Sequence, residues 1–459
     1  MRNGTALAPG ATTMGEKIRF GLGDMGCNFG WTFISGFLTL YYTDSVGISA
    51  AFVGTMMLIT RVLDGVSDLA MGVVIEKTNT RWGKARPWLL FGGVPMALSL
   101  ALIFNVPAGL GETAKNGYVF LTYVFMTVIA YTAVGVAYNA LIPRFSLNAD
   151  DRNVVSAVRG VVVIVTALVI SIGTPELLKA FGGQQSARAW SLTSILYAAL
   201  ALICLMITFL GVKERIPPKM DLTTGKVEST PIKRALGILL RNKYFYIATV
   251  LFIFFYAING VGGITVYYCR DILGRFELYG LISAIGIVPM VLTIPFAPAL
   301  YKKFGKRNVM LVGAVIAAGG CVVQLTAPSV LTVFLTGSVV RGFGSILFSA
   351  SIFTLASDIV EFSDWKHGIR AEGLVTSVNS VGLKVGTGLG SALVGWLLDF
   401  GGYNAALGTQ PRSALNSMII LQIGVPLILF AALAVLLLFW DLEKLRPQIE
   451  KDLAQKLKL

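Results

Sequence analysis

Apolar and polar stretches alternate along the whole chain with the spacing of membrane-spanning helices. Apolar runs of about 20 residues, enough for one helix to cross the hydrocarbon core, recur between short polar segments. The pattern predicts an all-α integral membrane protein. The predicted spans are twelve, at residues 18–43, 50–76, 87–106, 117–142, 153–178, 189–211, 245–269, 278–300, 308–327, 331–357, 373–399 and 414–440.

The longest polar segment lies between the sixth and seventh predicted spans and divides the chain into halves. It carries Pro217-Pro218 and mixed charges, which are typical of a linker. The predicted organisation is an N-terminal six-helix bundle (1–211), a cytoplasmic linker (212–244), a C-terminal six-helix bundle (245–440) and a cytoplasmic tail (441–459).

Two short basic turns stand at corresponding places in the halves. Residues 81–86 (RWGKAR) follow the second predicted span, and residues 303–307 (KFGKR) follow the eighth, which is the second of its half. Repetition of a six-helix unit is typical of secondary transporters, whose substrate site lies near the midplane between the halves. The halves are therefore predicted to be pseudosymmetric bundles.

Composition and charge fit a membrane protein better than a nucleic-acid-binding one. Charged residues make up 14% of the chain, against about 25% in soluble domains. Most of the 38 Lys and Arg residues fall in loops on one side of the predicted membrane, so the net charge of +14 reflects topology. This bias predicts a multi-pass protein of the bacterial cytoplasmic (inner) membrane with both termini cytoplasmic and no nucleic-acid partner.

The sequence offers little for catalysis. His367 is the only histidine, which argues against His-rich metal sites and Ser-His catalysis, and no Walker A sequence is present. The run Gly21-x-Gly23-x-x-Gly26 resembles a dinucleotide fingerprint, but no βαβ pattern surrounds it, so we interpret it as helix packing. We expect no enzymatic activity.

Three charged residues share one face of the second predicted span. Asp64 and Asp68 lie one helical turn apart, and Arg61 precedes them. A charge at the centre of a bilayer costs about 2.5–3.5 kcal/mol, and two close carboxylates need a proton, a metal ion or a cationic partner. The pattern favours a cation-coupled carrier. The alternative is a structural ion pair with Arg61.

Other charges fall inside predicted spans: Asp24, Arg159, Arg341 and Lys384. Lys384 needs an anion, and Asp64 or Asp68 is the natural candidate, either in cation coupling or in a static salt bridge. Arg159 and Arg341 suit forked hydrogen bonds to substrate hydroxyls or an anionic group. We interpret the charged run 358–372 as a loop, either a gating latch or an ordinary solvated segment.

Several motifs together resemble the glycoside–pentoside–hexuronide:cation symporter family of the major facilitator superfamily. They are Asp64-Gly-Val-Ser-Asp68-Leu-Ala-Met-Gly72, residues 79–87 (NTRWGKARP), Gly21-Leu-Gly-Asp24, Tyr41-Tyr-Thr-Asp44 and residues 368–373 (GIRAEG). The resemblance runs from about Lys17 to the last span and implies the major facilitator fold.

The resemblance also implies roles for individual residues. Asp64 and Asp68 fall on the family's cation carboxylates and would be the metal ligands if the ion is Na⁺; Ser67 and Thr132 fall on or beside further cation ligands. Lys384 matches the coupling lysine. The positions that the resemblance assigns to the substrate site are Asn28, Asn139, Arg159, Ser349, Asn379 and Ser380. Arg341 is a further candidate from its charge inside a span, and the alternative is snorkelling or pairing within the bundle.

The chain departs from melibiose permease within that family. Asn28 and Gly135 stand where that permease has sugar-binding aspartates, and Asn139 and Ser349 stand at its two cavity tryptophans. Loss of two carboxylates beside Arg159 would make the cavity more cationic. We therefore hypothesise a preference for an acidic or sulfonated sugar.

The resulting prediction is a monomeric secondary transporter that imports a sugar or glycoside with Na⁺ or H⁺ by alternating access, without a cofactor. Its partners are the small-molecule sugar, the monovalent cation and the lipid bilayer. The alternative within the same fold is a carrier of a non-sugar substrate such as a lysolipid or drug. A membrane-embedded enzyme and a receptor are the remaining alternatives.

Overall fold

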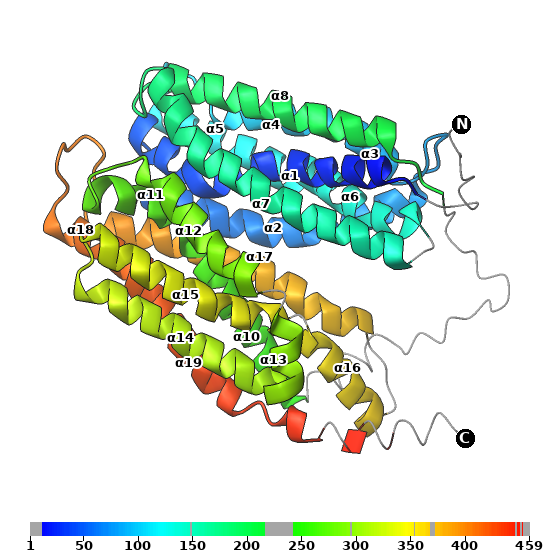
Figure 1. The fold of residues 1–459 in the computed structure, drawn as a ribbon. Helices are drawn as coiled ribbons and strands as arrows, with labels where there is room; N and C mark the ends of the chain where they lie inside the picture. The colour runs from blue at the N-terminus through cyan, green and yellow to red at the C-terminus, as the bar shows by residue number, and fades with distance from the viewer. Residues whose placement is uncertain are drawn as a thin grey trace, which may run out of the picture. The chain divides into compact units, whose positions relative to one another are not determined.

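The computed structural model describes residues 12–146, 149–215, 242–293, 296–352, 354–367, 372–445, 448–449 and 452, and these are almost entirely helical (Figure 1). The chain splits into two compact units, Met1–Leu222 and Thr223–Leu459. Most of the predicted linker, residues 216–241, lies outside the described residues.

The first unit contains eight α-helices and two π-helical turns among its described residues. These are α1 (Met14–Leu40), η1 (Tyr41–Ser45), α2 (Ala50–Lys77), α3 (Arg86–Phe91), α4 (Gly93–Ile103), α5 (Glu112–Val124), η2 (Phe125–Tyr131), α6 (Thr132–Phe145), α7 (Ala149–Ala180) and α8 (Ala187–Gly211). Helix α1 packs against α7 and α8, and α2 packs against α6.

The second unit repeats long apolar helices interrupted by short turns. Its described elements are α10 (Lys243–Gly260), η3 (Val261–Ile264), α11 (Thr265–Tyr267), η4 (Tyr268–Ile272), α12 (Leu278–Thr293), α13 (Ala297–Phe304), α14 (Lys306–Thr326), α15 (Leu331–Ile352), α16 (Thr354–His367), α17 (Glu372–Phe400), α18 (Arg412–Ile419), η6 (Ile420–Gly424) and α19 (Val425–Leu438). Helix α14 packs against α15 and α19, and α10 packs against α17.

Within the described residues, nine helices are long and apolar enough to cross a membrane. The three other predicted spans, 18–43, 50–76 and 278–300, coincide with α1, α2 and α12. The second of these carries the three charges noted above, which lower its hydropathy. The chain is therefore a multi-pass helical membrane protein, and the count of twelve stays a prediction.

Helix α1 carries the glycines that resemble a dinucleotide fingerprint, and they are packing positions. A Cβ on Gly23 would lie 2.5 Å from Cε2 of Tyr138, and one on Gly26 would lie 2.8 Å from the carbonyl oxygen of Ala201. Helices approach this closely only where a side chain is missing. The interpretation as helix packing is confirmed.

The two basic turns fold alike, each around a glycine and a carboxylate. Gly83 and Gly305 have φ values of +107° and +81°, and a Cβ on either would collide with the carboxylate of Glu214 or Glu443. A glycine is needed at both places because L side chains rarely adopt this backbone conformation and because the carboxylate occupies the space.

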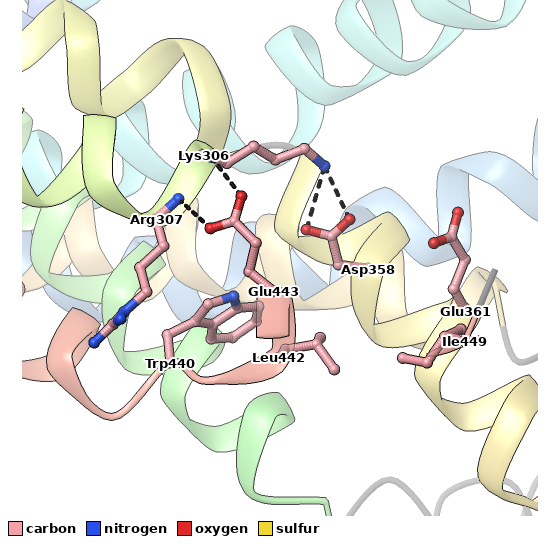
Figure 2. A pocket seen from close by; sticks show the side chains of 8 residues that line it. All are labelled: Lys306, Arg307, Asp358, Glu361, Trp440, Leu442, Glu443 and Ile449. Atoms are coloured by element: carbon pink, nitrogen blue, oxygen red, sulfur yellow. Dashed lines mark hydrogen bonds and ion pairs between the residues drawn. The ribbon is translucent and has the colours of Figure 1, made fainter. Parts of the chain in front are cut away.

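Each carboxylate caps the N-terminus of the helix that follows the turn. Glu214 accepts hydrogen bonds from the backbone N–H groups of Lys84 (3.1 Å), Ala85 (2.8 Å) and Arg86 (2.7 Å) at α3. In the second unit, the carboxylate of Glu443 accepts from two backbone N–H groups at the start of α14, at 2.7 and 3.0 Å (Figure 2). Carboxylates satisfy the unpaired donors of a helix N-terminus and its partial positive charge.

The arginine of each turn then closes a second contact. The Nε of Arg86 donates to the carbonyl oxygen of Phe209 (2.6 Å), and the Nε of Arg307 donates to that of Leu437 (2.8 Å). Both acceptors lie near the end of the last long helix of their unit. The same carboxylate clamp therefore recurs in both units, which supports an internal repeat.

The charged run 358–372 is largely helical rather than the predicted loop. Helix α16 extends from Thr354 to His367, and residues 368–371 lie outside the described residues. The carboxylate of Asp358 pairs with Nζ of Lys306 at 2.9 Å, as Figure 2 shows, so this acid has a partner in its own unit. Helix α16 begins at Thr354, four residues before the run, and its helical hydrogen bonding extends to His367.

Candidate functional site

The predicted cation residues Asp64, Ser67 and Thr132 meet inside the first unit. Oγ1 of Thr132, on α6, donates a hydrogen bond to Oδ1 of Asp64, on α2, at 2.9 Å. The hydroxyl of Ser67 lies 3.3 Å from that of Thr132 and 3.0 Å from the backbone oxygen of Asp64. The side chains of Asp64 and Thr132 are buried. One carboxylate and two hydroxyls are thus gathered within hydrogen-bonding distance, and Asp68 is half-buried one helical turn further along α2.

A π-helical turn places Thr132. The segment η2 ends at Tyr131, and Oγ1 of Thr132 lies 3.2 Å from the carbonyl oxygen of Thr127, five residues earlier. A π turn inserts an extra residue into a helix, which rotates everything that follows it, and such turns are frequent at functional sites. The apolar composition of η2 carries no sequence signal for it.

Arg61 lies beside this cluster without closing it. Its Nη1 is 3.8 Å from Oδ2 of Asp64, longer than a hydrogen bond, while its guanidinium lies 4.1 Å from the centre of the Trp31 ring. The guanidinium of Arg61 therefore interacts both with the carboxylate of Asp64 and with the face of the Trp31 ring. The ion pair considered as the alternative is therefore present at 3.8 Å, on Oδ2 of Asp64, while Oδ1 accepts a hydrogen bond from Thr132.

A second polar cluster in the first unit contains Asn28, Asn139 and Arg159, all predicted to contact substrate. Nε of Arg159 donates to Oδ2 of Asp24 at 2.7 Å, and its Nη2 donates to Oδ1 of Asn139 at 3.1 Å. The amide of Asn28 donates to the backbone oxygen of Asp24 at 2.9 Å. The structure therefore brings these three residues together around an aspartate.

Asp24 was identified in the sequence as a charge inside a span but not as a site residue. Its position four residues before Asn28, on the same helical face, was the available signal. The hypothesis of a more cationic cavity assumed an unbalanced Arg159. Because the carboxylate of Asp24 lies 2.7 Å from Nε of Arg159, the charge is balanced at this cluster.

In the second unit, Arg341 and Ser349 line one cavity of about 400 Å³. Nη1 of Arg341 donates to the backbone oxygen of Gln422 at 3.1 Å, and the hydroxyl of Thr265 lies 3.0 Å from Oε1 of Gln422. Sequence reasoning missed the other polar residues that line the cavity: Asn259, Thr265, Ser338, Ser345 and Gln422. Four polar residues of α15, at 338, 341, 345 and 349, follow helical spacing, which was a usable signal.

The remaining predicted residues, Asn379, Ser380 and Lys384, lie on α17 and are not among the residues that line this cavity. Oδ1 of Asn379 accepts a hydrogen bond from the hydroxyl of Tyr256 at 3.1 Å, Ser380 is exposed and Lys384 is half-buried. Lys384 belongs to the second unit and Asp64 and Asp68 to the first. The predicted ion pair between them stays a prediction.

The model of one protein family, described as MFS/sugar transport protein, matches residues 19–444. This chain belongs to that family. The MFS/sugar transport family contains transporters, so the expectations of a major facilitator fold and of no enzymatic activity are confirmed.

Curated relatives extend over nearly the whole of this MFS/sugar transport protein. The "Isoprimeverose transporter" of Lactiplantibacillus pentosus is 32% identical over 446 residues, which cover 96% of this chain and 91% of that protein. The "Glucuronide carrier protein homolog" of Escherichia coli is 27% identical, with 84% of each chain covered. Both names agree with the family that the motifs indicated.

Among solved structures, a bacterial homologue of the human lysosomal transporter Spinster superposes with a TM-score of 0.69 over 96% of this chain and 99% of that one. Its sequence identity is 13%, so the likeness concerns the fold alone.

Proposed function

We propose that this protein imports a sugar or glycoside together with a cation, Na⁺ or H⁺, across the bacterial inner membrane, with both termini in the cytoplasm. The observation that carries the proposal is the cluster of buried Asp64 and Thr132 with half-buried Ser67 within a membrane-spanning unit. The printed names of the relatives, an isoprimeverose transporter and a glucuronide carrier homologue, support a sugar as the substrate.

The cluster suits a small cation. Hard cations prefer several oxygen ligands, and a bound cation would add to the positive charge of Arg61 beside Asp64. Asp64 supplies a carboxylate oxygen, Thr132 and Ser67 supply hydroxyl oxygens, and Asp68 brings a second carboxylate to the same face. A proton needs only one of these carboxylates, so the oxygen set serves either ion.

Each unit by itself supplies proposed substrate contacts. In the first unit they are Asn28, Asn139 and Arg159, and in the second they are Arg341 and Ser349 of the cavity and Asn379 and Ser380 of α17. Coupling follows if sugar and cation together stabilise closure more than either alone. Lys384, a half-buried cation on α17, is the residue proposed to respond to cation binding.

Uptake by purified protein in liposomes tests the proposal. With an inward Na⁺ or proton gradient, the wild type should accumulate isoprimeverose or a related glycoside above its external concentration. Asp64→Asn and Asp68→Asn should abolish accumulation. Asp399→Asn, the same substitution at an exposed site, is the matched control and should accumulate normally.

Two results would contradict the proposal. Undiminished accumulation in both α2 variants would remove the cation site from these carboxylates. Saturable transport of lysolipid by the wild type, with no sugar moved, would replace the substrate class.

A further inference from the structure

An arginine, a tryptophan and a tyrosine form a chain of contacts inside the first unit. The guanidinium of Arg61, on α2, lies 4.1 Å from the centre of the Trp31 ring on α1. The centre of the Trp31 ring in turn lies 5.4 Å from that of Tyr131, the last residue of η2. Three segments of the unit therefore meet through an aromatic pair and one buried positive charge.

One end of this chain of contacts lies at the proposed cation site. Nη1 of Arg61 is 3.8 Å from Oδ2 of Asp64, and Tyr131 directly precedes Thr132, whose hydroxyl binds Oδ1 of Asp64. Among the described residues, the guanidinium of Arg61 forms no hydrogen bond. Arg61 thus interacts with one carboxylate and one aromatic face, and neither partner holds it by a hydrogen bond.

The other end lies at the polar cluster proposed to contact the sugar. Trp31 follows Asn28 by three residues on α1, so the two side chains are neighbours on one face of the helix. Trp31 and Tyr131 are both half-buried. Among the described residues, a Cβ added to Gly135 would meet only the Tyr131 ring, at 3.7 Å, so there is room beside that ring. Aromatic surface next to a few polar groups is typical of small-molecule sites, and a sugar ring has apolar C–H faces that pack on such surface.

The coupling ion changes which of its two partners Arg61 prefers. Without an ion, the ionised carboxylate of Asp64 attracts the guanidinium, and this attraction is strong where little water screens it. Na⁺ or a proton on Asp64 removes that attraction. The face of the Trp31 ring, which attracts cations through its quadrupole, is then the remaining partner. Either ion therefore shifts Arg61 from Asp64 toward Trp31.

We propose that Trp31 is the positioning residue that links the cation site to the sugar site within the first unit. The ion drives Arg61 onto the Trp31 ring, and the ring, in contact with Arg61 and Tyr131, then presents a fixed apolar wall to the sugar beside Asn28. A wall that is fixed before the sugar arrives loses less freedom on binding. The inference rests on the proposed sugar–cation symport and assigns one route by which the ion raises sugar affinity.

Two variants of Trp31 test the inference on the purified full-length protein. Trp31→Leu removes the aromatic face, and Trp31→Phe keeps a ring that attracts cations less strongly than indole does. The matched controls are Trp396→Leu and Trp396→Phe, at an exposed tryptophan of α17. Isoprimeverose affinity is measured by calorimetry with and without Na⁺ and at two pH values. The ratio of the affinities with and without the ion is the coupling factor.

Trp31→Leu should lower the coupling factor by about 2- to 30-fold, which is the range of cation–π energies expressed as a ratio of affinities. Trp31→Phe should lie between Trp31→Leu and the wild type, and both Trp396 variants should keep the wild-type factor. Tryptophan fluorescence gives a second reading. The ion should change the emission of the wild type and of Trp396→Phe, and this change should disappear in Trp31→Phe.

The outcomes separate this inference from the proposed function. If the wild type binds no sugar, or no ion changes its sugar affinity, the proposed symport fails. If the wild type shows coupling and Trp31→Leu keeps the full factor, the inference alone is overturned. An equal loss of sugar affinity with and without the ion would make Trp31 a plain sugar contact, which also overturns the link. If Trp31→Leu does not fold, Trp31→Phe decides, and a wild-type coupling factor with a wild-type emission change would overturn the inference.

Discussion

Replacement of Thr132 by valine isolates one oxygen of the proposed cation site. Valine has nearly the shape of threonine, so the substitution removes the hydroxyl that donates to Oδ1 of Asp64 at 2.9 Å and changes little else in the buried contact. In the proposed site the Thr132 oxygen would contact the bound cation, and a contact between a hydroxyl and a full charge contributes about as much as a hydrogen bond to a charged group, about 1.5–3 kcal/mol. Loss of this oxygen should therefore weaken Na⁺ binding by about 10- to 150-fold, at 1.4 kcal/mol for each factor of ten.

The assay is the Na⁺ concentration that gives half-maximal sugar binding to the purified protein. Thr132→Val should raise that concentration while sugar affinity at saturating Na⁺ changes little. If the coupling ion is the proton, Na⁺ should have no effect in either protein, and the variant should instead shift the pH of half-maximal uptake.

Thr127→Val is the matched control. Thr127, within η2, is likewise a buried threonine, but its hydroxyl donates to the backbone oxygen of Tyr123 at 2.9 Å. This control should keep the wild-type dependence on the cation. Equal behaviour of the two variants, whether both are normal or both are impaired to the same degree, would refute a specific role for the Thr132 hydroxyl.

Two further predictions concern stability. Glu214→Gln should lower the free energy of unfolding by about 1–2 kcal/mol, because it removes the charge that caps α3. Thermal denaturation of the detergent-solubilised protein measures this change, and Glu277→Gln, at an exposed position, should change the free energy little. Gly23→Ala should lower the free energy of unfolding by about 1–3 kcal/mol, because the added methyl group would collide with Tyr138. Gly117→Ala, where nothing lies within 4 Å of the added methyl group, should leave that free energy unchanged or raise it. Equal stability of the two alanine variants would contradict the close packing of α1.

The periodicity of the sequence was enough to predict the helices and to predict which residues share a face on some of them. Asp64 and Asp68 are four residues apart, so their common face follows from helix geometry alone. The contact of Asp64 with Thr132 was expected only from family resemblance, because residues 68 positions apart in sequence carry no periodic relation. The π turn that sets the rotation of Thr132 could not be predicted, because its amino-acid composition does not differ from that of an apolar α-helix.

The pairing of Asp24 with Arg159 shows a second limit. Each charge was visible as a costly residue inside a span, yet the choice of partner depends on how α1 and α7 are rotated against each other. Sequence reasoning therefore recognised two isolated charges and overestimated the positive charge near Arg159. The carboxylate clamps at Gly83 and Gly305 were anticipated only as similar basic turns, since Glu214 and Glu443 lie far along the chain.

The most direct test of a cation site on α2 is the reciprocity of binding, measured by calorimetry on the purified protein. Sugar affinity is determined with and without Na⁺ and at two pH values, for the wild type and for Asp64→Asn. The account predicts that one cation tightens sugar binding in the wild type, that sugar tightens binding of that cation by the same factor, and that both effects vanish in the variant. A cation effect of equal size in Asp64→Asn would contradict it.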